Sequence, residues 1–204
     1  MAVADVMARV AQIQAQAQRA LVPTAPPSSQ FEQLLAAAAT PSSAAVPLFA
    51  TGSQVDALTA DTPGTRALAV AEGEVGQAEQ PPGSNDGPRI AEYRTATAGA
   101  YAGAPWCAYF VSWAAAQSGT PIGDGGTGLG SVAGITDWAT RTGRLLPPSE
   151  TPQPGDLILF GDRHVGFVES VAPDGSLTTV EGNSSSAVSR VQRARTEATG
   201  FVRL

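Results

Sequence analysis

The only cysteine and the only histidine of the chain are the residues best suited to chemistry. Cys107 lies in GAPWCAYFVSW, after a proline and before an apolar run, and His164 lies in GDRHVGFVESV. The apolar run predicts a helix from about Trp106 to Ser118, so Cys107 would stand near its N-terminus. Unpaired backbone N–H groups at that end favour negative charge, and a nearby imidazolium favours it more.

Each of these residues also has an ordinary structural interpretation. A free cysteine is often a small buried apolar residue, and a lone histidine is usually a core or surface residue. Together, however, they predict a thiolate that attacks an amide carbonyl and an imidazole that protonates the leaving amine. The backbone N–H of Cys107 would help to stabilise the oxyanion.

An imidazole of this kind needs a residue that orients it, and a hairpin supplies two candidates. If Ala172–Gly175 form a four-residue loop, Val171 pairs with Ser176 and His164 pairs with Asn183. Glu181 then lies diagonally on the same face of the sheet, and any loop of even length keeps it there, whereas an odd length moves it to the other face. The spacing admits either Glu181 or Asn183 as the orienting residue, and EGN also fits a strand end followed by a turn.

The surrounding pattern predicts helices first and an antiparallel meander afterwards, which is an α+β arrangement. Turn residues separate the short β-type runs. The helical segments are TRALAVAEGEVGQ, RIAEYRTATAG, residues 106–118 and SVAGITDWATRTG, and the β-type runs are GDLILF, HVGFVESV, SLTTVEG, AVSRVQRA and GFVRL.

The N-terminal part differs in composition. A 3-4 spacing of apolar residues predicts a helix over residues 1–22, prolines then break the pattern, and Ser29–Glu32 read as a capping box for a short helix. We therefore expect an N-terminal helix over residues 1–22, a Pro/Ala/Ser-rich linker with a short helix over residues 23–64, and a folded domain over residues 65–204.

Composition and sequence patterns argue against a nucleic-acid partner, a membrane span, an internal disulfide and a standard secretory signal. The net charge of −6 argues against a nucleic-acid ligand, which requires clustered cations. No apolar run approaches the length of a membrane span, and one cysteine cannot form an internal disulfide. The sequence MAVADVMARVAQIQ lacks the pattern of a standard secretory signal.

The region from about Ala67 to Leu204 resembles the CHAP domain, the cysteine/histidine-dependent amidohydrolase/peptidase family. The resemblance rests on PPGSNDGPRIAEY, PWCAYFVSW, PQPGDLILF, HVGFVESV and TTVEGN, which occur in the order typical of the family. It implies a papain-like fold similar to that of NlpC/P60 hydrolases, with Cys107 as nucleophile, His164 as base, Glu181 as third catalytic residue and Asn183 as an accompanying residue. It also implies a substrate, the peptide part of bacterial peptidoglycan, cut by an endopeptidase or an N-acetylmuramoyl-L-alanine amidase.

Two further residues are candidates for the substrate groove. Trp106 fits the groove or the core equally well, and Asn85 fits a turn better than the cleft, while Tyr109, Phe110 and Trp113 fit the buried face of a helix. The loops SNDGP and GDGGTGLG hold too few acids for calcium, and one histidine with one cysteine is a poor zinc site, so we expect no metal and no cofactor.

The expected function is a peptidoglycan hydrolase that acts outside the cytoplasm, in the cell envelope or after secretion. The alternatives are a wall-binding or assembly module without activity, and a lytic enzyme of phage origin. ADVMARVAQIQ and FEQLLAAAA resemble the leaders of proteins exported through the flagellar apparatus, so residues 1–40 are the candidate contact with flagellar export or rod proteins.

Overall fold

The computed structural model describes residues 61–204. The predicted N-terminal helix, the short helix after Ser29–Glu32 and nearly all of the predicted linker lie outside these residues. The first described helix begins at Pro63, two residues before the predicted domain boundary. Thr62 caps it, because its hydroxyl accepts a hydrogen bond from the Thr65 backbone N–H at 3.1 Å while the Thr65 hydroxyl accepts from the Thr62 backbone.

The described residues confirm the predicted α+β order. Most helix starts follow local signals: proline is the first residue of α3 and α4, and Ser131 caps α6. The bounds are α3 Pro63–Glu72, α4 Pro88–Arg94, α5 Cys107–Gln117 and α6 Val132–Arg141, with short 3-10 turns at Asp124–Gly126 and Arg195–Glu197.

One antiparallel sheet of six strands follows, in the order β1-β6-β2-β3-β4-β5. The meander prediction is correct from β2 to β5, but β6 returns to pair with β2 on its other side, and the two-residue strand β1 beside it was not predicted. The strands are β1 Leu145–Leu146, β2 Leu157–Phe160, β3 His164–Val171, β4 Leu177–Ser184, β5 Ala187–Arg193 and β6 Gly200–Val202.

The hairpin between β3 and β4 differs from the prediction in an instructive way. Val171 pairs with Leu177, so the loop has five residues, 172–176, and the predicted four-residue loop is wrong. An odd loop would move Glu181 to the face opposite His164. A bulge between Val168 and Ser170 shifts the register by one residue, so that Phe167 pairs with Val180 and the predicted register is restored near His164.

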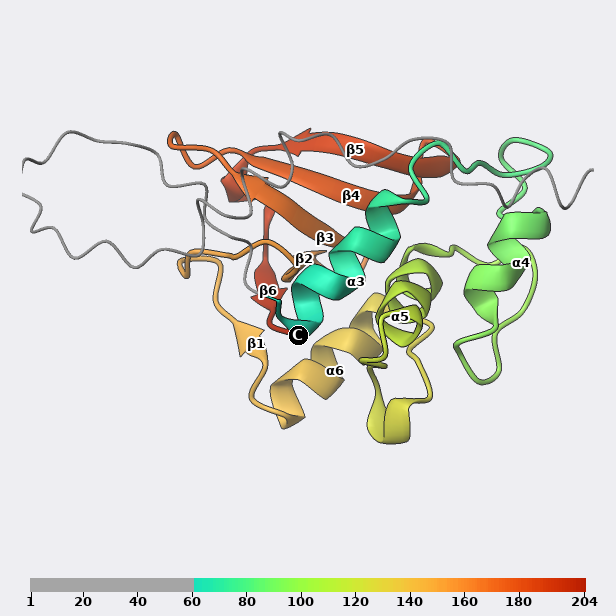
Figure 1. Cartoon of the computed structure of the whole chain (residues 1–204), viewed down its shortest axis with the longest axis horizontal. Coiled ribbons are helices and arrows are strands. Elements are labelled where there is room, and N and C mark those ends of the chain that lie inside the picture. Colours follow the sequence, from blue (N-terminus) through green and yellow to red (C-terminus); the bar gives the residue numbers. More distant parts are fainter. Residues whose placement is uncertain (1–60) are drawn as a thin grey trace, which may run out of the picture. The chain divides into compact units, whose positions relative to one another are not determined.

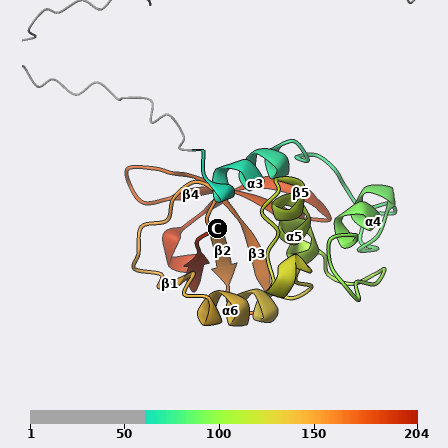
Figure 2. The same cartoon turned by 60° about the horizontal axis from the view of Figure 1, so that its bottom comes forward.

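The sheet has one face covered by helices and one smaller apolar cluster on the other side. Helices α3 and α5 pack together and against β3 and β4, and α4 packs on the outer side of α5 (Figure 1, Figure 2). Side chains such as Phe167 and Val180 face the helices, whereas Ile158, Val168 and Phe201 form the second cluster. Helix α5 therefore lies between the sheet and α4, with α3 beside it on the sheet.

None of the helices in residues 61–204 has both the length and the apolar character needed to cross a membrane.

Candidate active site

Cys107 is the first residue of α5, as predicted, and is 4% exposed. The helix is buried on nearly all sides, because every residue from Cys107 to Ala115 is buried. Its first backbone hydrogen bond runs from the Phe110 N–H to the Trp106 carbonyl at 2.9 Å. Within the described residues the N–H groups of Cys107 and Ala108 have no acceptor, so they remain available to a ligand beside the sulfur.

His164 is the first residue of β3, and its imidazole lies between two acidic or potentially acidic groups. Its Nε2 lies 2.8 Å from Oε2 of Glu181, which leaves Nδ1 as the nitrogen that can face the sulfur of Cys107. The ring packs against Phe160, with 5.7 Å between ring centroids, and the side chain is 20% exposed. The imidazole is thus held by the sheet and still reachable from solvent.

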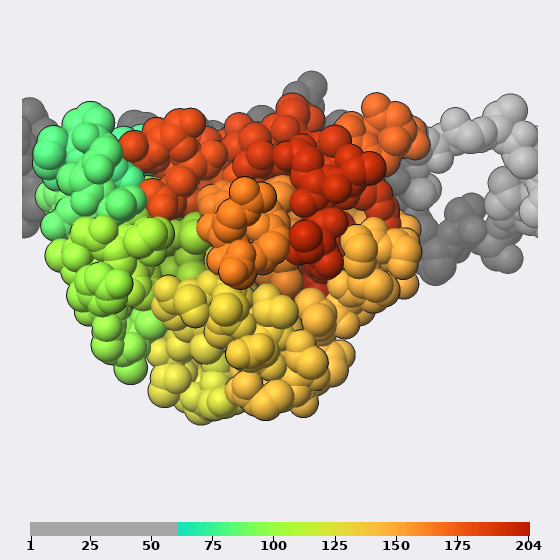
Figure 3. All heavy atoms as spheres, turned by 180° about the vertical axis from the view of Figure 1, so that it is seen from behind, coloured from blue at the N-terminus to red at the C-terminus, as the bar shows by residue number. Residues whose placement is uncertain are grey.

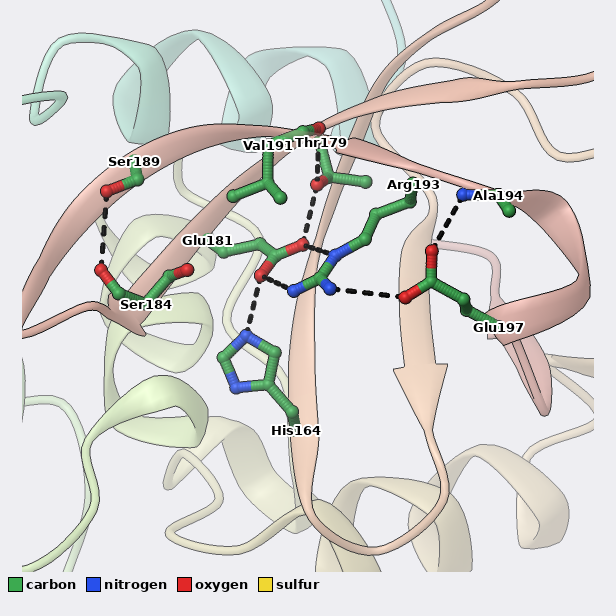
Figure 4. A network of polar contacts seen from close by, with 9 residues as sticks. All are labelled: His164, Thr179, Glu181, Ser184, Ser189, Val191, Arg193, Ala194 and Glu197. Carbon is green, nitrogen blue, oxygen red and sulfur yellow. Dashed lines mark hydrogen bonds and ion pairs between the residues drawn. The ribbon is translucent and has the colours of Figure 1, made fainter.

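Glu181 is the residue that orients this imidazole, and it is fully buried. Its carboxylate lies between the ring of His164 and the guanidinium of Arg193 (Figure 4). Arg193 donates from Nε to Oε1 at 2.8 Å and from Nη2 to Oε2 at 2.7 Å, and the Thr179 hydroxyl donates to Oε1 at 2.6 Å. Burial raises the pKa of Glu181, but the hydrogen bonds from Arg193, His164 and Thr179 outweigh it and lower the pKa to about 2.

The same contacts keep the imidazole charged. Burial lowers the pKa of His164, but hydrogen bonds with the side chains of Cys107 and Glu181 raise it to about 9. At neutral pH the imidazole is therefore an imidazolium that adjoins the Cys107 sulfur. The charged imidazole can therefore give a proton to a leaving group that lies beside the sulfur.

Gly166 makes room for the carboxylate. It lies on β3 two residues after His164, and a β-carbon at this position would come within 2.6 Å of Cγ of Glu181 and 3.1 Å of the Val180 carbonyl oxygen. Its backbone φ is not in the left-handed region, so the requirement for glycine here is one of space and not of backbone conformation.

The two residues after Glu181 position the helix that carries the cysteine. A β-carbon on Gly182 would lie 2.6 Å from Cβ and Cγ of Phe110, so this glycine permits the close approach of α5 to β4. Asn183 adopts a left-handed conformation with φ of 61°, and its Oδ1 accepts a hydrogen bond from the Trp106 N–H at 3.3 Å. Asn183 therefore binds the start of α5, while Glu181 is the residue that contacts the imidazole.

Glu79 completes this support. Its Oε1 accepts from Nδ2 of Asn183 at 3.0 Å and from Nε1 of Trp106 at 2.9 Å, and its side chain is buried, with no hydrogen-bond partner for Oε2. Burial raises the pKa of Glu79, but the hydrogen bond from Trp106 and further hydrogen bonds lower it overall. Backbone hydrogen bonds hold the segment against the sheet: the Gly76 N–H donates to the Val188 carbonyl of β5 at 2.9 Å, and the Glu79 N–H donates to the carbonyl of Ser186, just before β5, at 2.8 Å.

The two groove candidates have structural roles. Trp106 is fully buried, stacks on Tyr93 with 5.6 Å between ring centroids and lines neither the cavity beside Cys107 nor the cavity beside His164, which favours the core interpretation over the groove interpretation. Asn85 lies in a tight turn with φ of 51°, and its Oδ1 accepts from Nδ2 of Asn183 at 2.9 Å. It supports Asn183 and does not line either cavity.

Two cavities border the sulfur and the imidazole. The first, of about 440 Å³, has Cys107, Pro105, Tyr109 and Val132 in its wall and is mainly apolar. The second, of about 410 Å³, has His164 in its wall and is mainly polar. On the face shown in Figure 3, the segment around residue 160 meets the segment around residue 130 and the last strands.

Sequence reasoning located the cysteine, histidine and glutamate but missed their supports. Arg193 and Thr179 lie within the predicted β-type runs, and Glu79 lies just after the predicted helical segment TRALAVAEGEVGQ, outside every expected element. The one available signal for Thr179 was its position two residues before Glu181, which puts both side chains on the same face of β4. Arg193 and Glu79 are distant in sequence, and no local pattern identifies them.

A comparison with protein-family models agrees with the resemblance to the CHAP domain. The family model of the CHAP domain matches residues 99–183, a segment that contains Cys107, His164, Glu181 and Asn183. Among solved structures, the chain is similar to the peptidoglycan hydrolase RipB from Mycobacterium tuberculosis, with 20% identity and a TM-score of 0.44. That alignment covers 69% of this chain and 64% of the RipB chain. Among curated proteins, no significant match to the sequence was found.

Proposed function

Because residues 99–183 match the CHAP domain, we propose that this protein is a cysteine hydrolase that cleaves an amide bond in the peptide part of bacterial peptidoglycan. The observation that supports the proposal is the alignment of three groups from distant parts of the chain. A thiol at a helix N-terminus adjoins an imidazole, which is bound at 2.8 Å by a fully buried carboxylate. This is the arrangement that nucleophilic acyl transfer requires.

In the proposed mechanism, the thiolate of Cys107 attacks the carbonyl carbon of the scissile amide. The free N–H groups at the start of α5 stabilise the negative oxygen that forms. His164 gives its proton to the leaving amine, which departs as the acyl-enzyme forms. His164 then takes a proton from water, and the resulting hydroxide attacks the thioester. The sulfur leaves as a thiolate beside the imidazolium, which restores the starting pair.

Glu181 keeps the ring in place through both steps. Since its carboxylate already receives two hydrogen bonds from Arg193 and one from Thr179, it stays ionised and fixed when the imidazole charge changes. We assign it as a positioning residue, with Cys107 and His164 as the catalytic residues.

Substitution of the cysteine tests the proposal. Cys107→Ala should abolish the release of fragments from purified peptidoglycan and leave the circular dichroism spectrum and thermal midpoint close to those of the wild type. A wild-type protein that binds peptidoglycan but releases no fragment would instead support a wall-binding or assembly module without activity.

Thiol alkylation provides an independent test. Iodoacetamide should modify Cys107 unusually fast at pH 6–7, and His164→Gln should slow this reaction by at least tenfold because the imidazolium that favours the thiolate is removed. An alkylation rate that is slow in both proteins would contradict the proposed pairing.

Mass spectrometry of the released fragments would identify the bond. New N-termini within muropeptides indicate endopeptidase action, whereas free lactyl groups on muramic acid with intact stem peptides indicate an N-acetylmuramoyl-L-alanine amidase. Cleavage restricted to one of these bonds would select between the two activities that the family resemblance implies.

We further propose that the enzyme acts outside the cytoplasm and that residues 1–40, which lie outside the described residues, direct its export by the flagellar apparatus to a place where the rod crosses the wall. The support is the resemblance of ADVMARVAQIQ and FEQLLAAAA to flagellar export leaders. Deletion of residues 1–40 should block export while activity on purified peptidoglycan persists. Export that continues after the deletion would contradict the role of this segment, and release by phage-type lysis would then be the better explanation.

A further inference from the structure

The cavity beside His164 differs in charge from the cavity beside Cys107. Its wall is formed by Phe160, Arg163, His164, Arg193 and Glu197, so four of its five residues are ionisable. The cavity beside Cys107 is lined mainly by small and apolar or aromatic residues, among them Tyr101, Pro105 and Val132. The two cavities therefore suit different parts of a substrate.

Of the cations in the His164 cavity, Arg193 is already neutralised. Its Nε and Nη2 bind Glu181 at 2.8 and 2.7 Å, its Nη1 binds Glu197 at 3.2 Å, and its guanidinium carbon lies 4.7 Å from the centre of the Phe160 ring. Figure 4 shows that the guanidinium points toward these two carboxylates. Glu197 is likewise occupied, since its Oε1 accepts from the Ala194 N–H at 2.7 Å. The charge of Arg193 is therefore already balanced by two carboxylates within the wall of the cavity.

Arg163 is different, because within residues 61–204 its side chain has neither a hydrogen bond nor an ion pair. It precedes His164, is exposed, and lines both cavities, so it stands where they meet. A guanidinium presents a planar fork of donors that matches a carboxylate. An unpaired arginine beside a cationic imidazole is therefore suited to bind an anionic group of the substrate.

The chemistry decides which part of the substrate carries that group. The acyl carbon bonds to the sulfur of Cys107, and the leaving amine receives its proton from His164. The acyl side of the scissile bond therefore lies toward the Cys107 cavity and the amine side toward the His164 cavity. We propose that Arg163 is a specificity-determining residue that binds a free carboxylate on the amine side of the scissile amide. This inference rests on the proposed function and narrows its substrate to peptides with that carboxylate.

The test compares initial rates on purified peptidoglycan with rates on the same material after carbodiimide and ammonia have converted its free carboxyl groups to amides. With substrate below saturation, the wild type should cleave the untreated material roughly tenfold faster, as expected for one charge-assisted hydrogen-bonded contact. Arg163→Gln should lose this preference through a slower rate on untreated material, while its rate on amidated material stays within about twofold of the wild type.

Arg66→Gln is the matched control, because it also removes one positive charge from an exposed side chain but lies on α3, in the wall of neither cavity. It should keep the wild-type preference. Equal wild-type rates on the two materials, or a full preference retained by Arg163→Gln, would overturn the inference while leaving the hydrolase intact. A wild type that cleaves neither material would overturn the proposed function, and the inference with it.

Discussion

Replacement of Gly166 by alanine tests the geometry of the site without removing a functional group. The added β-carbon would lie 2.6 Å from Cγ of Glu181 and 3.1 Å from the carbonyl oxygen of Val180. Ordinary contact begins at 3.4 Å, so Glu181 has to retreat by about 0.8 Å. A retreat of that size along the bond to His164 would stretch the 2.8 Å contact to about 3.6 Å, beyond hydrogen-bonding range.

The consequences follow from the loss of that hydrogen bond. A hydrogen bond to a charged group contributes about 1.5–3 kcal/mol, so kcat should fall by about ten- to a hundredfold. The pKa of His164 should also fall below its value of about 9, because Glu181 is one of the two groups that raise it. The free energy of unfolding should fall by about 1–3 kcal/mol, the usual cost of overpacking.

Proton NMR titration and peptidoglycan turnover measure these effects together. The chain contains one histidine, so the imidazole signal needs no assignment. Gly73→Ala is the matched control, since a β-carbon there has its nearest neighbours at 3.4 and 3.9 Å and the backbone has φ of −63°. If Gly166→Ala titrates and turns over like the control, Glu181 does not position the imidazole in the way described.

Three other predictions follow from the same contacts. The contribution of His164 to folding stability is complete below its ordinary pKa of 6.5 and is lost as the pH rises through about 9. The contribution of Glu181 is complete above its ordinary pKa of 4.5 and is lost as the pH falls through about 2. The urea midpoint of unfolding should therefore fall at both low and high pH. Glu181→Gln should abolish the part of the fall at low pH that Glu181 causes. If the variant lost stability at low pH as the wild type does, the ionised state assigned to Glu181 would be refuted. Asn183→Gly and Asn183→Ala should both lower kcat. In thermal unfolding, the alanine variant should be less stable than the glycine variant by about 1 kcal/mol, because the backbone at this position is left-handed. Equal stability of the two variants would contradict a role for this backbone conformation. Gly182→Ala should destabilise the fold by about 1–3 kcal/mol through its overlap with Phe110, and a neutral effect in urea would show that α5 can move away from β4.

The α+β order could be predicted because its signals are local. Proline, serine and threonine at helix starts, apolar runs and turn residues each act within a few positions. The same locality placed Cys107 at the start of α5 and His164 at the start of β3. Loop length in the β3–β4 hairpin could not be predicted, because Pro173-Asp174-Gly175 fits loops of four or five residues. The bulge at Glu169, which offsets the odd loop, leaves no clear signal in HVGFVESV.

The chain's own residue types, read in order, determined which groups could react: one thiol, one imidazole, and a choice between Glu181 and Asn183. Only the tertiary structure decided between the last two, and the reason is distance along the chain. Glu181 is fixed by Arg193, which lies on the neighbouring strand, and Asn183 is occupied by Glu79 and by the start of α5, which come from segments far earlier in the sequence. Such contacts depend on how strands and helices pack, and packing joins residues that no local spacing relates.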